Sequence, residues 1–442
     1  MGVMLQAFYW DCPRLAGREH AWWDAVKEKL PELAAAGFTA LWLPPASKAA
    51  SWQSMGYDPY DYYDLGEFDQ KGGVPTWFGT RAALEDLVRA THASGLQVYA
   101  DMVFNHNSGA DEPEVNPLDG QTRWTRFTPA SGRFPRDWTC FHPSPYGLND
   151  HESFGGMPDL CHRNPRVYIE LIQYCRWLLE DVGFDGFRYD CVRGFGGWMV
   201  RSIQELRARR GDASFKPYAV AECWDSDRAI DDWLGVADSF AENPAGAFDF
   251  PLRWRLRDLC DRPGFSLREL AQPGVLAWDR PRDAVTFVEN HDVARDTPIV
   301  HDKLMAYAFI LTHEGYPCVF WQDYFDFGLA RPGQASGIDA LVAAHEQHAG
   351  GPARVLLADD DLYVMQRDGD GGRRGLVLVL NNRGAWQGSV VQTRWAGTRL
   401  VPVAWRGRED AGVPEAKGTD EHGRADLWAP PRGYAVYVPA AG

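Results

Sequence analysis

The chain has 442 residues, of which 45% are apolar, and a formal net charge of −16. This length exceeds one ordinary core and suits one large domain with a smaller one. The acidic balance disfavours phosphate backbones and anionic membrane surfaces, so we expect no nucleic acid and no membrane as partners. A neutral ligand is compatible with this charge.

The cysteines and the amino terminus bear on the compartment. Eight cysteines are scattered without a Cys-x-x-Cys pair, which is typical of buried thiols rather than of a disulfide framework. Residues 3–8 have the pattern of a strand, so no signal peptide is visible, and no apolar run is long enough to span a bilayer. We expect a cytoplasmic monomer, with a secreted protein whose signal sequence has been removed as the alternative.

Short apolar runs rich in β-forming residues alternate with amphipathic helical patterns over the first 350 residues or so. Eight runs are predicted as strands, at residues 3–8, 38–43, 96–104, 184–189, 218–221, 247–252, 284–288 and 317–321. Helical patterns lie at residues 22–36, 81–93 and 165–180. This α/β alternation predicts a parallel (β/α)8 TIM barrel, with an open doubly wound sheet as the alternative.

Two stretches depart from this alternation. Residues 107–163, after the third strand, are rich in Gly, Pro, Asp and His and far exceed a usual loop, so we expect an inserted subdomain, domain B. After a helix near residues 338–348, alternating runs at 362–366, 376–380, 399–403 and 434–438 predict an antiparallel β-sandwich. The expected domains are a barrel at 1–106 and 164–350, domain B at 107–163 and a C-terminal β domain at 351–442.

Polar side chains gather where the predicted strands end. In a parallel barrel these ends meet at one rim, which carries the active site. A single acid at such a position is better interpreted as a helix cap, but capping is a poor explanation for polar groups at four strand ends. The residues concerned are Asp101, Asn105, His106, Arg188, Asp190, Glu222, Glu289, Asn290, His291 and Asp292.

A pair of carboxyl groups is what hydrolysis of a glycosidic bond requires. One protonates the leaving oxygen, while the other attacks the anomeric carbon or activates a water. In retaining enzymes the two groups are about 5–5.5 Å apart. Asp190 and Glu222 end neighbouring predicted strands, which suits that spacing. The two acids therefore suit the carboxyl pair that this reaction requires.

Several segments resemble the α-amylase family, glycoside hydrolase family 13. The four short motifs of the family are matched at residues 101–106, 186–190, 222 and 287–292. Residues 6–11, 42–48, 55–61, 65–72, 248–252 and 306–312 resemble bacterial, plant and archaeal liquefying α-amylases. The resemblance covers roughly residues 3–350. It implies retaining endo-hydrolysis of α-1,4-glucosidic bonds in starch, glycogen or maltooligosaccharides.

The resemblance implies a separate role for each of three carboxylates. Asp190 would be the nucleophile that forms a covalent glycosyl-enzyme intermediate, and Arg188 would keep it ionised. Glu222 would be the general acid/base, whose pKa burial and the charge of Asp190 would raise. Asp292 would hold the 2- and 3-hydroxyls of the distorted sugar and stabilise the oxocarbenium-like transition state.

Five further residues would contact the substrate if the family's roles carry over. His106 and His291 would hydrogen-bond the sugar at the cleavage point, and Tyr57 would stack on it. Arg193 and Trp224 would belong to the acceptor side. Core packing is the alternative for Tyr57 and Trp224. Arg193 stands where many relatives have lysine, whose hydrogen-bond geometry differs, so the acceptor contacts stay open.

The resemblance also implies a Ca²⁺ that links domain B to the barrel. Oxygen ligands from several loops suit this ion. A neighbouring zinc site of archaeal relatives would use His142, but Leu148 and Asn149 stand where a cysteine pair would be expected. The implied calcium ligands are the side chains of Asn105, Asp150 and Asp159 and the backbone carbonyls of Glu152 and Gly194.

Three other functions are alternatives to endo-hydrolysis. The Arg193-Gly194 pair also recurs in exo-acting amylases that release maltotetraose, so an exo-acting maltooligosaccharide-forming enzyme is the main one. A transglycosylase is the second, because a sugar hydroxyl can intercept a retaining intermediate. A non-catalytic carbohydrate-binding barrel is the third. Such proteins typically lack one of the three carboxylates, and all three are present here.

Overall fold

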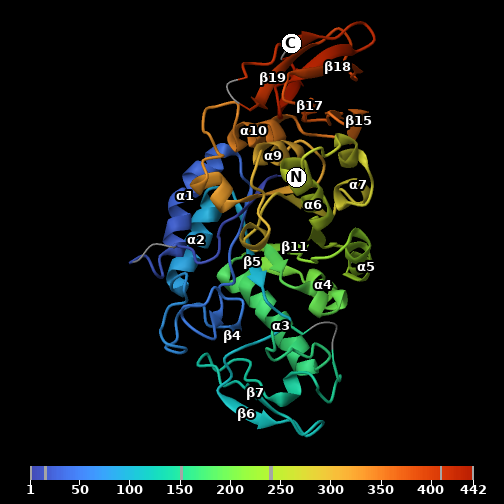
Figure 1. Ribbon diagram of the computed structural model, residues 1–442. Coiled ribbons are helices and arrows are strands. Elements are labelled where there is room, and N and C mark those ends of the chain that lie inside the picture. The colour runs from blue at the N-terminus through green and yellow to red at the C-terminus, as the bar shows by residue number, and fades with distance from the viewer. Residues whose placement is uncertain (1, 14–16, 150–152, 238–241, 409–410, 441–442) are drawn as a thin grey trace. The chain divides into compact units, whose positions relative to one another are not determined.

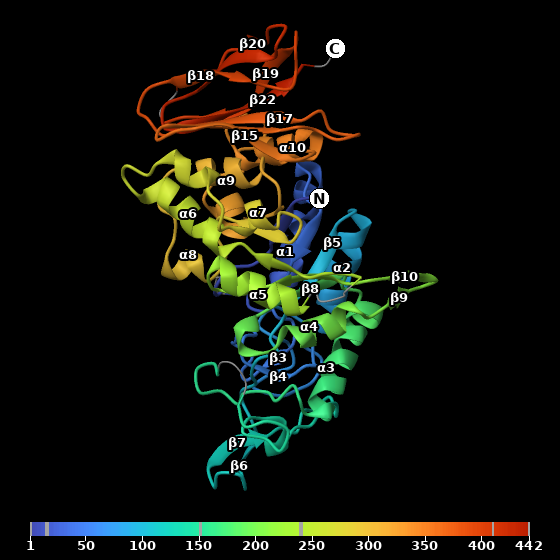
Figure 2. The ribbon, with the colours of Figure 1, turned by 90° about the vertical axis from the view of Figure 1, so that its right-hand side faces the viewer.

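The computed structural model describes residues 2–13, 17–149, 153–237, 242–408 and 411–440 (Figures 1 and 2). Eight parallel strands close a barrel in the order β1-β14-β13-β12-β11-β8-β5-β2, which confirms the predicted (β/α)8 barrel and excludes the open sheet. These strands are β1 (Met4–Gln6), β2 (Ala40–Trp42), β5 (Gln97–Met102), β8 (Gly186–Tyr189), β11 (Tyr218–Ala221), β12 (Gly246–Phe248), β13 (Ala284–Phe287) and β14 (Tyr316–Phe320).

Several predicted strands are longer than the observed ones, and the sixth extends into a helix. The sixth run was expected to extend over residues 247–252, but β12 ends at Phe248 and helix α6 (Phe250–Asp261) follows at once. The reason is local, because Asp249 Oδ1 accepts a hydrogen bond from Leu252 N at 3.0 Å and Pro251 occupies the first turn. An N-cap and a proline thus convert an apolar, strand-like run into the start of a helix.

The chain forms two compact units. The first unit comprises Met1–Gln6, Ala35–Phe38 and Asp249–Gly442, and the second comprises Ala7–Ala34 and Thr39–Phe248. Helix α1 (Trp22–Ala36) has the predicted bounds and belongs mostly to the second unit. The other helices of the second unit are α2 (Arg81–Ala93), α3 (Pro165–Trp177), α4 (Gly197–Gln204) and α5 (Asp227–Ala237).

In the second unit a long segment follows β5 and returns before α3. It contains the hairpin of β6 (Glu112–Val115) and β7 (Thr122–Arg126), which is drawn in cyan in Figure 1. The first and last residues of this segment lie side by side. Asn107 N donates to Pro158 O at 3.0 Å, and Leu160 N donates to Asn105 O at 2.9 Å. A short β-hairpin and loops therefore occupy the place where domain B was expected.

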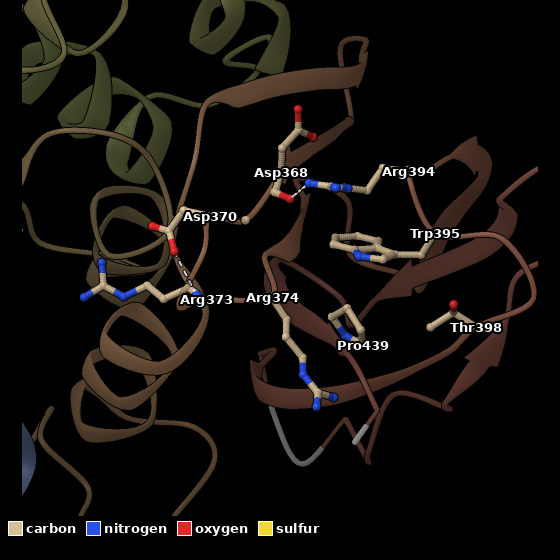
Figure 3. Close-up of a pocket in the computed structure, with 9 residues that line it drawn as sticks. Asp368, Asp370, Arg373, Arg374, Arg394, Trp395, Thr398 and Pro439 are labelled. Atoms are coloured by element: carbon tan, nitrogen blue, oxygen red, sulfur yellow. Dashed lines mark hydrogen bonds between the residues drawn. The ribbon is translucent and has the colours of Figure 1, made fainter. Parts of the chain in front are cut away.

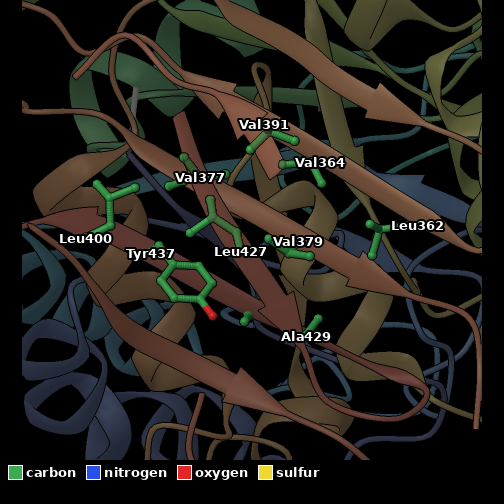
Figure 4. Close-up of a cluster of buried hydrophobic side chains, with 11 residues drawn as sticks. Leu362, Val364, Val377, Val379, Val391, Leu400, Leu427, Ala429 and Tyr437 are labelled. Atoms are coloured by element: carbon green, nitrogen blue, oxygen red, sulfur yellow. The ribbon is translucent and has the colours of Figure 1, made fainter. Parts of the chain in front are cut away.

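In the first unit, two antiparallel sheets of the C-terminal region enclose an apolar core (Figure 4). Their orders are β15-β16-β17-β22-β19-β20 and β18-β21, which confirms the predicted C-terminal β domain. The sequence missed β15, β18, β20 and β21. The strands are β15 (Ala353–Ala358), β16 (Leu362–Arg367), β17 (Leu376–Asn381), β18 (Gln387–Gln392), β19 (Arg399–Arg406), β20 (Lys417–Gly418), β21 (Arg424–Ala429) and β22 (Gly433–Pro439).

The C-terminal β domain contacts α6 and the segments next to α9 (Lys303–Ile310) in the same unit through buried and partly buried polar groups. His313 Nε2 lies 2.7 Å from Tyr363 Oη, and Arg432 Nη2 donates to Leu259 O at 2.7 Å while Arg432 Nε contacts Asp302 Oδ2 at 2.7 Å. Across the described ranges, no helix has both the length and the apolar character that crossing a bilayer would require. The remaining helices of this unit are α7 (Leu276–Asp279), α8 (Val293–Asp296) and α10 (Ile338–His348).

Candidate active site

Arg188 is the centre of an ionic cluster at the carboxyl ends of β5, β8 and β11. Asp101 and Arg188 are register partners on neighbouring strands, so their side chains point to the same face. Arg188 Nη1 donates to Asp101 Oδ1 at 2.7 Å and to Asp190 Oδ1 at 2.8 Å, and Nη2 lies 2.7 Å from Glu222 Oε1. One fully buried guanidinium therefore contacts three carboxylates.

The charges of this cluster shift two pKa values. Burial raises the pKa of Asp101 to about 6, the charge of Asp190 adds to that rise, and Arg188 opposes it. Burial alone would lower the pKa of Arg188, but the charges of the surrounding carboxylates hold it well above its usual value. The guanidinium thus stays charged, while more negative charge surrounds it than one cation neutralises.

Backbone hydrogen bonds to neighbouring strands fix the positions of Asp190 and Glu222. Asp190 N donates to Met102 O at 3.0 Å and Glu222 N donates to Tyr189 O at 2.9 Å, which continues the barrel pairing beyond the ends of the strands. Cys191, directly after Asp190, has a left-handed backbone (φ +46°) that is strained for a residue with a side chain. In this conformation its N–H donates to Glu222 Oε2 at 3.2 Å.

Tyr57 and His106 lie on the edge of the same cluster. Tyr57 Oη donates to Asp101 Oδ2 at 2.8 Å, and its ring packs against Trp10 with 5.4 Å between centroids. His106 Nε2 lies 2.9 Å from Tyr57 O, and the imidazole stacks on Phe154 at 4.8 Å. Tyr57 is only partly buried, so it is not a core tyrosine, and its predicted stacking on a sugar stays a prediction.

Arg193 and Trp224 are brought together on the loops after β8 and β11. Arg193 Nη1 donates to Trp224 O at 3.1 Å and lies 3.3 Å from Asp225 Oδ2. The Arg193 side chain is exposed and Trp224 is partly buried. Both are thus accessible, as the predicted acceptor role requires, although that role stays a prediction.

His291 and Asp292 belong to the first unit, where they follow β13. Asn290 Oδ1 accepts from Asp292 N at 3.0 Å and from Val293 N at 2.9 Å, which fixes the turn. Gln6 Nε2 lies 2.8 Å from His291 Nδ1, so a donating Gln6 amide places the hydrogen of the neutral ring on Nε2. His291 Nε2 in turn lies 3.2 Å from Asp292 Oδ2.

Glu289 has a structural position beneath this turn. Its Oε2 accepts from Arg253 Nη2 at 3.0 Å, its Oε1 accepts from Ile299 N at 2.6 Å, and Lys303 Nζ lies 3.3 Å away. Burial raises the pKa of Glu289, and the two nearby cations oppose that rise. This fully buried carboxylate therefore holds together the segments that flank Asp292.

Three contact residues had no role in the sequence prediction. Asp101 accepts from Arg188, Tyr57 and Trp42 Nε1, the last at 3.0 Å. Gln6 orients His291, and Trp10 supports Tyr57. A polar residue at the carboxyl end of an apolar strand had already placed Asp101 among the strand-end residues, and the same signal was available for Gln6.

Three of the five implied calcium ligands lie together in the second unit. Asp159 pairs with His106 in an isolated β-bridge, next to Asn105. A β-carbon at Gly194 would lie 1.8 Å from Asn105 Oδ1, so the backbone of Gly194 approaches that oxygen closely. Asp150 and Glu152 lie outside the described residues. Within the described ranges, no group of three or more His, Cys, Asp or Glu could hold a metal ion.

Known proteins resemble this chain over nearly its full length. Residues 16–210 match the family described as "Alpha amylase, catalytic domain" and residues 376–438 match "Alpha-amylase C-terminal". The α-amylase of Geobacillus stearothermophilus is 31% identical over 97% of this chain and 87% of its own length. The glucan 1,4-α-maltohexaosidase of Bacillus sp. strain 707 is 31% identical over 86% of this chain and 82% of its own length. The crystal structure of the Geobacillus thermoleovorans α-amylase with acarbose superposes with a TM-score of 0.71 at 19% identity, covering 100% of this chain and 98% of that one.

Proposed function

Because the chain belongs to the α-amylase family, glycoside hydrolase family 13, and its relatives include α-amylases, we propose that it cleaves internal α-1,4-glucosidic bonds by a retaining mechanism. The observation that carries this proposal is the shared guanidinium of Arg188. Because Asp190 and Glu222 contact nitrogens of one planar group, the contacting oxygens lie within roughly 8 Å of each other, so the two acids form a carboxyl pair that can act on one glycosidic bond. This limit includes the separation of retaining enzymes and part of the inverting range, and the stereochemistry of the product distinguishes the two.

Each half of the reaction uses both carboxyl groups. In the first half a carboxylate oxygen of Asp190 attacks the anomeric carbon, the bond to the leaving oxygen breaks, and Glu222 gives that oxygen its proton. In the second half Glu222 takes a proton from water, the resulting hydroxide attacks the anomeric carbon, and the ester bond to Asp190 breaks. Arg188 Nη1 donates to Asp190 Oδ1 at 2.8 Å and so holds this carboxylate in place for the attack.

Asp292 and His291, which belong to the first unit, have a separate part in the proposed mechanism. His291 Nε2 lies 3.2 Å from Asp292 Oδ2, so this buried imidazole can position the carboxylate that would bind the sugar hydroxyls. Asp292 is partly accessible, with 19% of its side chain exposed, so a substrate can reach it. Stronger binding to the flattened ring of the transition state than to the relaxed sugar would accelerate cleavage.

The stereochemistry of the first product tests the mechanism. The enzyme is mixed with maltoheptaose, and the anomeric protons are followed by NMR before mutarotation. We expect the new reducing end to appear as the α-anomer. Initial appearance of the β-anomer would contradict a retaining reaction and would assign the two carboxylates to inversion instead.

An exo-acting enzyme is the second candidate, favoured by the similarity to a glucan 1,4-α-maltohexaosidase. The contact of Arg193 with Trp224 and Asp225 supports an ordered acceptor side, which either mode of action can use. Products from soluble starch at early times distinguish the two. A broad range of oligosaccharides supports endo action, while one dominant short product supports exo action.

We also propose that Ca²⁺ binds at Asn105, Asp159 and the carbonyl of Gly194. Asn105 Oδ1 is buried and has no hydrogen-bond partner in the part of the chain that the structure describes, which is unfavourable unless another group satisfies it. A bound Ca²⁺ would supply positive charge that holds these segments together. We expect that chelation with EDTA lowers the melting temperature by several degrees and that added Ca²⁺ restores it.

The control for chelation is Asn105→Ala, which removes the proposed ligand. Its melting temperature should be lower and should no longer respond to EDTA or to Ca²⁺. An unchanged melting temperature of the parent protein after complete chelation would contradict the calcium site.

A further inference from the structure

The C-terminal β domain has a surface hollow that the proposed reaction does not use. It is lined by two indoles, an exposed valine and an ion pair, and its volume is about 300 Å³. None of its residues belongs to the candidate active site. We name it the Trp386–Trp428 hollow, and its lining residues are Trp386, Val413, Glu415, Lys417 and Trp428.

Strand alternation places Trp428 on the outer face of its sheet. Leu427 and Ala429, its neighbours on β21, are fully buried in the core between the sheets (Figure 4). Because successive side chains of a strand point to opposite faces, Trp428 points away from that core. The core therefore does not require this indole.

Gly388 lets the Trp428 indole lie flat on the neighbouring strand. The two residues are register partners on β18 and β21, and a β-carbon at Gly388 would lie 2.4 Å from Trp428 Cγ. Covering a glycine in this way stabilises a sheet by itself. It also fixes the ring in one orientation, so that a ligand can bind its other face with little loss of conformational entropy.

The rim of the hollow is polar but has no net charge. Lys417 Nζ lies 2.8 Å from Glu415 Oε2, and these are its only charged lining residues in the described part of the chain. Another hollow of this domain differs, because three arginines and two aspartates surround a single indole, Trp395 (Figure 3). Two indoles with one neutral ion pair suit an uncharged ligand that has apolar faces and many hydroxyls.

We propose that the Trp386–Trp428 hollow is an accessory binding site for a neutral α-glucan chain. The indoles would pack against the C–H faces of glucose rings, and Lys417 and Glu415 would donate to and accept from hydroxyls. The α-glucan identity rests on the proposed function, whereas the neutral sugar class follows from the hollow itself. A second site on the chain raises the local concentration of an insoluble polymer at the enzyme.

Adsorption of the full chain to raw starch granules tests the site. Loss of one aromatic contact should weaken adsorption by about fivefold in Trp386→Ala and in Trp428→Ala, and by more in the double variant. The kcat/KM for soluble maltopentaose should change by less than about twofold, because the candidate active site is intact. Cellulose granules, a β-linked glucan, should adsorb parent and variants equally.

Two further variants control for the loss of any exposed indole and for misfolding. Trp124→Ala removes an indole that is 58% exposed on β7, outside the hollow, and should adsorb like the parent. Trp428→Phe retains a ring over Gly388 and replaces Trp428→Ala if that variant does not fold. Parental adsorption by the double variant, or an equal loss in Trp124→Ala, would overturn the proposal. An inactive parent whose adsorption still depends on both tryptophans would refute the proposed function and leave the sugar site standing.

Discussion

The two ends of strands β5 and β8 carry aspartates in opposite electrostatic settings. At the carboxyl ends, Asp101 and Asp190 share the single cation Arg188 with Glu222, and burial raises the pKa of Asp101 to about 6. At the amino ends, Asp185 accepts from Val98 N at 2.8 Å and contacts His92 and Arg210. There these donors and cations outweigh burial and lower the pKa of Asp185.

This difference in charge environment indicates that the carboxyl ends of β5 and β8 serve catalysis and that their amino ends serve stability. At the carboxyl ends several acids compete for one cation, so each is held in place without being fully neutralised. At the amino ends one acid receives three partners and is fully satisfied. In barrels of this kind the carboxyl ends carry the chemistry, and the opposite ends carry stability. Substitution of an acid at the carboxyl ends should therefore change mainly the activity, and substitution at the amino ends should change mainly the stability.

The largest expected effect is the loss of activity in Asp190→Asn. Without the attacking carboxylate, kcat for soluble starch should fall by at least about 10³-fold. The melting temperature should change little, because Asp101 and Glu222 still contact Arg188. Steady-state assay and thermal melting measure both quantities. Parental activity in this variant would refute the assignment of the nucleophile.

Removal of the shared cation should have the largest effect on stability. Arg188→Met leaves three buried carboxylates without their guanidinium, so we expect the free energy of unfolding to fall by about 3–5 kcal/mol. The matched control is Arg210→Met at the amino ends, where the side chain is 38% exposed and the loss should be below about 1 kcal/mol. Urea denaturation compares the two, and equal losses would contradict the proposed difference between the ends.

Asp185→Asn should lower stability without lowering activity. At neutral pH the variant should lose about 1–3 kcal/mol, because charge-assisted hydrogen bonds from His92 and Arg210 are weakened. The folded pKa of Asp185 lies below its unfolded value near 3.8, so this stabilisation is present above pH 3.8 and is lost as pH falls through the folded pKa. Urea denaturation at neutral and acidic pH measures the loss of unfolding free energy in the variant. A loss that is the same at both pH values would contradict a lowered pKa of Asp185 as its cause.

Asp101→Asn should show the opposite pH dependence. The folded pKa of Asp101 is raised to about 6 from 3.8, so its contribution to stability is greatest below pH 3.8 and declines as pH rises through 6. The stability of the parent relative to this variant should therefore decrease with rising pH in that window, by at most about 1.4 kcal/mol per pH unit. If the stability of the parent relative to the variant rises with pH instead, the folded pKa of Asp101 lies below its unfolded value, which contradicts the prediction.

Local sequence predicted some elements with their observed bounds. Helices α1, α2 and α10 begin and end where the pattern predicts, because amphipathic spacing is a local property and Thr80 caps α2 through a 3.3 Å hydrogen bond from Ala83 N. The strand pattern failed at residues 250–252, where Asp249 and Pro251 start a helix. It also missed β18 and β21, whose outer faces carry glycine and tryptophan instead of a regular polar series.

The sequence alone determined which residues end the strands and, through the family motifs, the chemistry they suit. Only the tertiary structure decided how the charges are shared. Asp101 is 87 residues from Arg188, and no local pattern shows that it is the register partner of that arginine and a competitor of Asp190 for the same guanidinium. Register between strands depends on how the closed barrel packs, and the pKa of a carboxylate depends on what packing places around it.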